Sequence, residues 1–89
     1  MSRLYGDVPR TCFERLPAGS IKRRLAYALA KRLGEWITTE DLIDVAYERG
    51  EGPLGAKEAL KAHVHALRDA LPGFAIDGHL RRGRRLRRI

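Results

Sequence analysis

The hydrophobic residues of this chain change their spacing at Pro72–Gly73, and that change constrains the fold more than any other feature. The apolar residues before the break are Leu60, Val64, Leu67 and Leu71. Their spacing of i, i+4, i+7 and i+11 predicts the buried face of an amphipathic helix over 56–71. Proline followed by glycine ends such a helix, so a different element must follow.

The segment after the break predicts a β-hairpin over 74–89. Alternate apolar positions indicate a strand with one inward side, made of Phe74, Ile76 and Leu80. Two dipeptides suit the turn, Asp77–Gly78 and Arg82–Gly83. The sequence leaves the choice between these two turns open.

Arginine makes up six of the last twelve residues, and two apolar residues interrupt this run. A disordered basic tail is one interpretation of such a run. Leu86 and Ile89 favour a folded element instead, because a free tail has no need of apolar anchors. We therefore expect both residues to fix the hairpin to the rest of the protein.

Two further helices precede the helix over 56–71. Ser20 is a good N-cap for a first helix that begins at Ile21 and ends before Gly34. After a short extended piece, Thr38 is the expected N-cap of a second helix of about nine to eleven residues. Its predicted inward residues are Leu42, Val45 and Ala46. Gly50 or Gly52 is expected to end it.

The order of helix, extended piece, helix, helix and hairpin is that of a winged helix–turn–helix. The predicted fold class is therefore mainly α with a small β-hairpin, with three helices and a C-terminal wing. This domain is expected to span 20–89. Residues 1–19 follow no firm period, and we expect an N-terminal arm or short strand there.

The length and the net charge favour one small basic protein with an anionic partner. The 89 residues allow one domain, and the net charge of +7 points most often to nucleic acid. Cys12 stands alone, so no intrachain disulfide can form. No apolar run reaches the length of a membrane span, and we expect a cytoplasmic protein without a membrane partner.

Three stretches carry a resemblance to a known family: "GEWITTEDLIDVAY", "ALKAHVHALRDAL" and "RRGRRLRR". Together they make residues 20–89 similar to the DNA-binding effector domain of OmpR/PhoB-type transcriptional regulators. The sequence includes no receiver domain. Ala66 stands where that family often has a groove-facing arginine. The resemblance implies a recognition helix in the major groove and a wing on the backbone or in the minor groove.

We therefore expect a double-stranded DNA-binding protein that regulates transcription. The recognition helix over 56–71 would read the major groove, and the arginine-rich wing over 74–89 would contact the backbone or the minor groove. The candidate DNA-binding residues are Lys57, Lys61, His63, His65, Arg68, Arg81, Arg82, Arg84 and Arg85.

Other functions stay open at this stage. A winged-helix adaptor or inhibitor that binds RNA polymerase or another regulator is the first alternative, and a nonspecific or RNA-binding basic protein is the second. RNA polymerase and a second copy of the chain are further partner hypotheses. We expect no enzyme, because the sequence lacks a phosphate-binding glycine loop and a nucleophile elbow. We also expect no cofactor and no metal, since His63 and His65 point in different directions on a helix.

Overall fold

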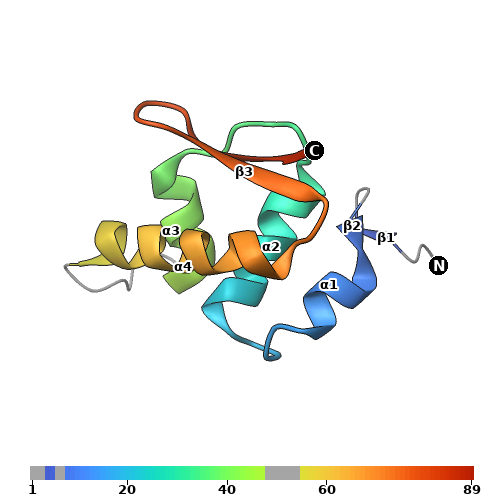
Figure 1. The fold of residues 1–89 in the computed structure, drawn as a ribbon. Coiled ribbons are helices and arrows are strands. Elements are labelled where there is room, and N and C mark those ends of the chain that lie inside the picture. Colours follow the sequence, from blue (N-terminus) through green and yellow to red (C-terminus); the bar gives the residue numbers. More distant parts are fainter. Residues whose placement is uncertain (1–3, 6–7, 48–54) are drawn as a thin grey trace.

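The computed structural model describes residues 4–5, 8–47 and 55–89, which form four helices and two small antiparallel sheets (Figure 1). The helices are α1 (Arg10–Glu14), α2 (Ile21–Lys31), α3 (Thr39–Tyr47) and α4 (Ala56–Ala70). The strands are β1 (Leu4–Tyr5), β2 (Val8–Pro9), β3 (Phe74–His79) and β4 (Gly83–Arg88). None of the described helices has the length and the apolar character that crossing a membrane requires.

The coarse prediction of helices followed by a C-terminal hairpin is confirmed. The sequence analysis predicted three helices, whereas the described residues form four. The short helix α1 lies in the segment for which we expected an arm or a strand. Val8, Cys12, Phe13 and Leu16 are buried there in the same core as the later helices. The Phe13 ring stacks on Tyr27 of α2, with the ring centroids 4.4 Å apart.

Two helices begin at the predicted caps. The Ser20 hydroxyl accepts a hydrogen bond from the backbone N–H of Arg23 at 3.2 Å, and the Thr38 hydroxyl accepts one from that of Asp41 at 3.2 Å. Each bond satisfies an N–H that has no partner within its helix. The predicted end of the second helix, at Gly50 or Gly52, lies outside the described residues.

The core lies where α2, α3, α4 and the inner side of the hairpin meet. The four residues of the α4 stripe, Leu60, Val64, Leu67 and Leu71, are all buried as predicted. Val45 was predicted to face inward, but its side chain is 37% exposed. Leu42 and Ala46 alone form the fully buried stripe of α3, which is enough for a short helix packed on one side.

The turn of the β3–β4 hairpin lies at 80–82, at the second of the two candidate positions. Ile76 pairs with Leu86 and His79 with Gly83. The prediction that Leu80 points inward was wrong, because it sits in the turn and is 98% exposed. Leu86 is fully buried, as expected of an anchor. The prediction that Ile89 is an apolar anchor was wrong, because its side chain is 82% exposed. Its backbone N–H donates to Gly73 O at 3.0 Å.

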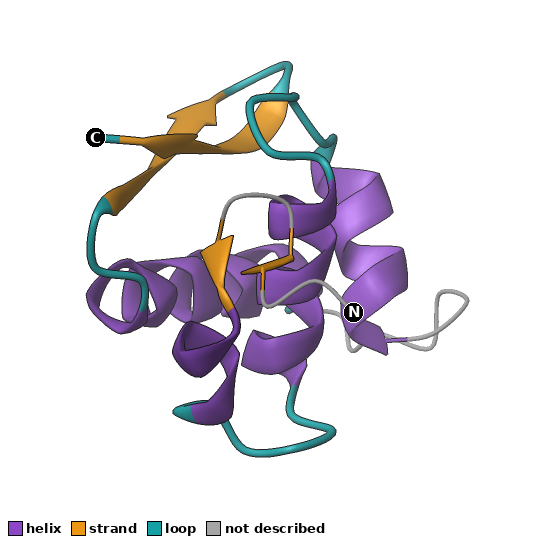
Figure 2. Ribbon diagram, turned by 90° about the vertical axis from the view of Figure 1, so that its right-hand side faces the viewer, coloured by secondary structure: helices purple, strands orange, loops and turns teal. Residues whose placement is uncertain are grey.

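The link between α2 and α3 pairs with the hairpin through an isolated antiparallel bridge at Ile37. Ile37 and Arg84 exchange two backbone hydrogen bonds of 2.8 and 2.9 Å, and Gly34 N donates to Leu86 O at 2.8 Å. Figure 2 shows the result, a hairpin held over one side of the helices. The hairpin is therefore part of the folded body.

Gly83 makes this pairing sterically feasible. Its φ is +95°, in the region that favours glycine. A Cβ at this position would overlap the Ile37 carbonyl oxygen and lie 2.7 Å from Thr38 Cα. A side chain at position 83 would therefore push the α2–α3 link away from β4.

This geometry predicts a large difference between two glycine substitutions. Gly73 also has a positive φ, +87°, but a Cβ there would meet no atom within 4 Å. Gly73→Ala should therefore cost about 1 kcal/mol of stability through backbone strain alone. Gly83→Ala should cost roughly 3 kcal/mol or more, because the Ile37–Arg84 pairing must also break. Urea unfolding followed by circular dichroism would measure both losses, and equal losses would contradict this role of Gly83.

Candidate nucleic-acid interface

A groove of about 470 Å³ separates the hairpin tip from the first turns of α3 and α4. Its basic lining residues are Lys57, Lys61, Arg81 and Arg84, and its acidic ones are Glu40 and Glu58. The four basic residues come from two segments that sequence analysis treated separately. In Figure 1, the hairpin tip and the N-terminal end of α4 lie at the same end of the molecule. The fold thus brings four of the predicted DNA-binding residues to one surface with an excess of positive charge.

Arg84 is the most enclosed of these basic residues. Its guanidinium lies across Gly78, where an added Cβ would come within 3.1 Å of Arg84 Nη1. Nη1 donates to Gly83 O at 3.2 Å. The Arg84 Nε is buried and has no hydrogen-bond acceptor among the described residues. A buried cationic donor without an acceptor is costly. The positive charge of this guanidinium adds to the cationic character of the groove that it lines.

The hairpin turn carries two exposed arginines and is held in shape by the preceding histidine. The His79 Nδ1 accepts hydrogen bonds from the backbone N–H groups of Arg81 at 3.1 Å and Arg82 at 3.2 Å. Because Nδ1 is an acceptor here, the proton of the neutral ring must be on Nε2. The same ring packs edge-on against Trp36, with centroids 5.8 Å apart. His79 therefore orders the turn and fixes the backbone positions of Arg81 and Arg82.

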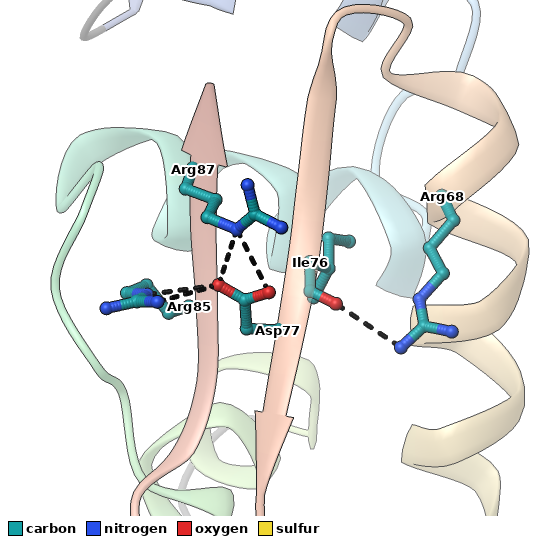
Figure 3. Close-up of polar contacts among 5 residues, drawn as sticks. All are labelled: Arg68, Ile76, Asp77, Arg85 and Arg87. Atoms are coloured by element: carbon teal, nitrogen blue, oxygen red, sulfur yellow. Dashed lines mark hydrogen bonds and ion pairs between the residues drawn. The ribbon is translucent and has the colours of Figure 1, made fainter. Parts of the chain in front are cut away.

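Arg85 and Arg87 bind a carboxylate of the hairpin itself (Figure 3). Two nitrogens of Arg85 donate to Asp77 Oδ2, at 2.8 and 3.2 Å. Arg87 Nε also reaches both oxygens of Asp77, at 2.8 and 3.1 Å. The Arg85 guanidinium also lies 4.6 Å from the ring centre of Trp36, within range of a cation–π interaction.

These contacts have an electrostatic consequence for Asp77. The hydrogen bonds from Arg85 and then from Arg87 stabilise the charged carboxylate and hold its pKa below the usual value of 3.8. Asp77 in turn offsets part of the positive charge of both arginines. Arg85, a predicted DNA contact, thus has partners inside the protein on the side of the sheet away from the groove.

Arg68 joins α4 to the outer edge of the hairpin. One terminal nitrogen, Nη2, donates to the carbonyl oxygen of Ile76 on β3 at 3.3 Å (Figure 3). The side chain is exposed, but this bond holds the guanidinium against the sheet edge. Arg68 therefore positions α4 and β3 relative to each other, and its predicted phosphate contact stays a prediction.

The exposed line of α4 is less basic than its flank toward the hairpin. Glu58, Ala62, His65 and Asp69 are all exposed and follow helical spacing along one face. Of these four residues, His65 alone was predicted to contact DNA. His63, another predicted contact, is partly buried on a different side of the helix. Any groove-reading surface of α4 would thus offer one imidazole, one methyl group and two carboxylates.

Sequence reasoning missed three residues of this region: Trp36, Asp77 and His79. The pairing of Asp77 with Arg85 follows directly from the turn position, since the two residues are opposite each other in the register. Choosing the turn at 80–82 would have predicted that ion pair. The His79 contacts depend on the ring's orientation in the turn and on Trp36 beside it, and no sequence spacing encodes them.

The part of the chain that the structure describes contains no group of three or more His, Cys, Asp or Glu side chains placed to hold a metal ion. Comparison with protein-family models, with curated proteins and with solved structures finds no significant match. The functional argument therefore depends on the geometry and charge of this surface.

The Asp77 cluster predicts a pH-dependent contribution to stability. Because the folded protein lowers the pKa of Asp77, this contribution is present above the unfolded value of about 3.8 and is lost as the pH falls through the lower folded value. Asp77→Asn should therefore melt below the wild type at pH 7, and the difference should shrink below about pH 3.8. Thermal melts between pH 7 and pH 2 would measure it.

The arginine partners provide the matched control for this measurement. In an Arg85→Gln, Arg87→Gln background, the substitution Asp77→Asn should no longer change how the melting temperature depends on pH. A difference between wild type and Asp77→Asn that stays constant down to pH 2 would contradict the ion-pair account.

Proposed function

We propose that this chain is a winged helix–turn–helix module that binds double-stranded DNA and regulates transcription. In this proposal α3 and α4 are the helix–turn–helix, α4 is the recognition helix, and the β3–β4 hairpin is the wing. The element order supports it, as does the antiparallel bridge from Ile37 to Arg84 of β4, which ties the hairpin to the segment before α3. The length of α4, 15 residues, also suits a helix that lies in a major groove.

The basic groove between α4 and the wing tip is the observation that carries the proposal. A helix in the major groove and a wing on the neighbouring minor groove would have one phosphate strand between them. Lys57 and Lys61 border that space from one side, and Arg81 and Arg84 from the other. Arginine presents a planar set of donors to phosphate oxygens, and two arginines line this space.

Sequence preference in this proposal comes from the exposed line of α4. His65 can donate to or accept from a base edge, and the Ala62 methyl group can contact a thymine methyl group. Glu58 and Asp69 are poor neighbours for phosphates but can accept from a cytosine amine. We therefore propose that α4 contributes base readout, while the groove contributes most of the binding free energy through phosphates.

A protein-interaction adaptor is the second candidate. Glu58 and Asp69 on the exposed line of α4 favour it, because two carboxylates there oppose a polyanion. An adaptor would bind a protein partner through the same helix and would have little affinity for duplex DNA. Selection of bound sequences from a random duplex pool, at two salt concentrations, separates the candidates. A sharp sequence motif supports the regulator, and no recovery of duplex supports the adaptor.

The salt dependence of duplex binding gives a quantitative test of the proposal. Phosphate contacts by Lys57, Lys61, Arg81, Arg84 and the neighbouring Arg82 predict a slope of log K against log salt of about −4.5. Lys57→Ala with Lys61→Ala should reduce the slope by about two units. Fluorescence anisotropy with a labelled duplex at several salt concentrations would measure both slopes.

Lys31→Ala is the control for the loss of charge. Lys31 is exposed at the end of α2 and does not line the groove. Its substitution should change the slope by much less than one unit. A wild-type slope near zero would contradict DNA binding. If Lys31→Ala changed the slope as much as each groove lysine does, the assignment of the groove as the binding surface would be contradicted.

A further inference from the structure

Leu80 is a large apolar side chain at the extreme tip of the hairpin, and it is 98% exposed. A single exposed leucine is common on protein surfaces and by itself indicates nothing. Leu80 differs from a chance surface residue in three respects: the order of its turn, its charged neighbours and its place beside the groove.

The turn that carries Leu80 is ordered before any partner binds. The His79 imidazole accepts both N–H groups of Arg81 and Arg82. The turn ends at Gly83, whose left-handed conformation and close contact with Ile37 fix the start of β4. A tip held in this way loses little conformational entropy on binding. The leucine is thus presented on a stiff support.

The surroundings of Leu80 identify the kind of partner. Arg81 and Arg82 follow it directly and are exposed. Leu80 also borders the basic groove together with Lys57 and Lys61. If a phosphate strand lies in that groove, the tip meets the neighbouring minor groove of the same duplex. Proteins that bind the minor groove often insert a leucine or another apolar side chain between base pairs, beside arginines that contact the walls.

We propose that Leu80 is an apolar wedge that enters the minor groove of bound DNA and partly unstacks one base step. This inference rests on the proposed function, since it needs a duplex in the basic groove. Arg81 and Arg82 would hold the phosphates on either side of the inserted leucine. The wedge differs from simple arginine insertion in its effect on the duplex, because unstacking a base step unwinds and bends DNA, whereas arginine in a narrow groove does neither.

Unwinding can be measured without knowing the preferred sequence. A closed circular plasmid is relaxed by topoisomerase I in the presence of the full chain, the protein is removed, and the linking number is read from a gel. The wild type should leave the plasmid negatively supercoiled in proportion to its occupancy. Leu80→Ser should reduce this change at least roughly three-fold at equal occupancy. It should also lower duplex affinity by about three- to ten-fold, because a buried leucine contributes favourably.

Two variants control for loss of fold and for loss of apolar surface. Leu80→Met keeps a long apolar side chain and should retain the linking-number change. Ile89→Ser removes another large exposed apolar side chain, 82% exposed, away from the tip, and should behave as the wild type. Thermal melts should be the same for Leu80→Ser and the wild type, since Leu80 makes no buried contact that the substitution would remove.

The outcomes separate this inference from the proposed function. The wedge is overturned, and DNA binding stands, if Leu80→Ser keeps the wild-type linking-number change. The same conclusion follows if the wild type binds duplex with the expected salt slope but leaves the linking number unchanged. If the wild type does not bind duplex at all, both are overturned. Loss of the change in Leu80→Ser, with retention in Leu80→Met and Ile89→Ser, supports the wedge.

Discussion

The backbone pairing of Ile37 with Arg84 fixes the position of the hairpin, and it depends on the missing side chain at Gly83. The two segments are far apart in the sequence, so their pairing closes a long loop around α3 and α4. It brings the hairpin tip to the same end of the molecule as the first turns of α4. The basic groove exists because of this closure. The buried side chain of Leu86 and the bond from Arg68 to Ile76 O hold the hairpin to the helices as well, and the pairing fixes the end that carries Arg81 and Arg84.

The register of the hairpin places the arginines of the C-terminal segment in different surroundings. Arg81 and Arg82 lie in the exposed turn, and Arg84 points toward the helices and into the groove. Arg85 and Arg87 point to the opposite side, where Asp77 binds both. Neighbouring residues of a strand face opposite sides of the sheet, so one sequence motif supplies both a structural ion-pair cluster and a candidate phosphate-binding surface.

The sequence predicts the elements of this fold well where the periodicity is strong and local. The stripe of α4 and the caps at Ser20 and Thr38 were predicted correctly, because each depends on residues within one or two helical turns. The short helix α1 was missed because five residues are too few to show a period. Leu80 was predicted to point inward because two turn positions were plausible. The choice between them depends on tertiary contacts of Gly83 with Ile37, which no local sequence pattern reveals.

The candidate site shows the same division between local and tertiary information. The basic character of α4 and of the hairpin follows from composition and spacing. That Lys57, Lys61, Arg81 and Arg84 lie on one surface could be seen only in the fold. The partner of Arg68 could not be deduced from the sequence, and that of Arg85 could be deduced only once the position of the turn was known. A guanidinium is long enough to reach phosphate, carboxylate or a backbone carbonyl, and the fold selects among them through the distances to Ile76 O and Asp77.

The central claim is that Lys57, Lys61 and the hairpin tip form one surface for duplex DNA. Titration of the ¹⁵N-labelled protein with a short duplex, followed by amide chemical shifts, tests it most directly. The account predicts that the largest shifts occur together at 57–65 and 79–84, and that α1 and the first turn of α2 change little. Shifts confined to α1 and α2, or no shifts at a saturating duplex concentration, would contradict it.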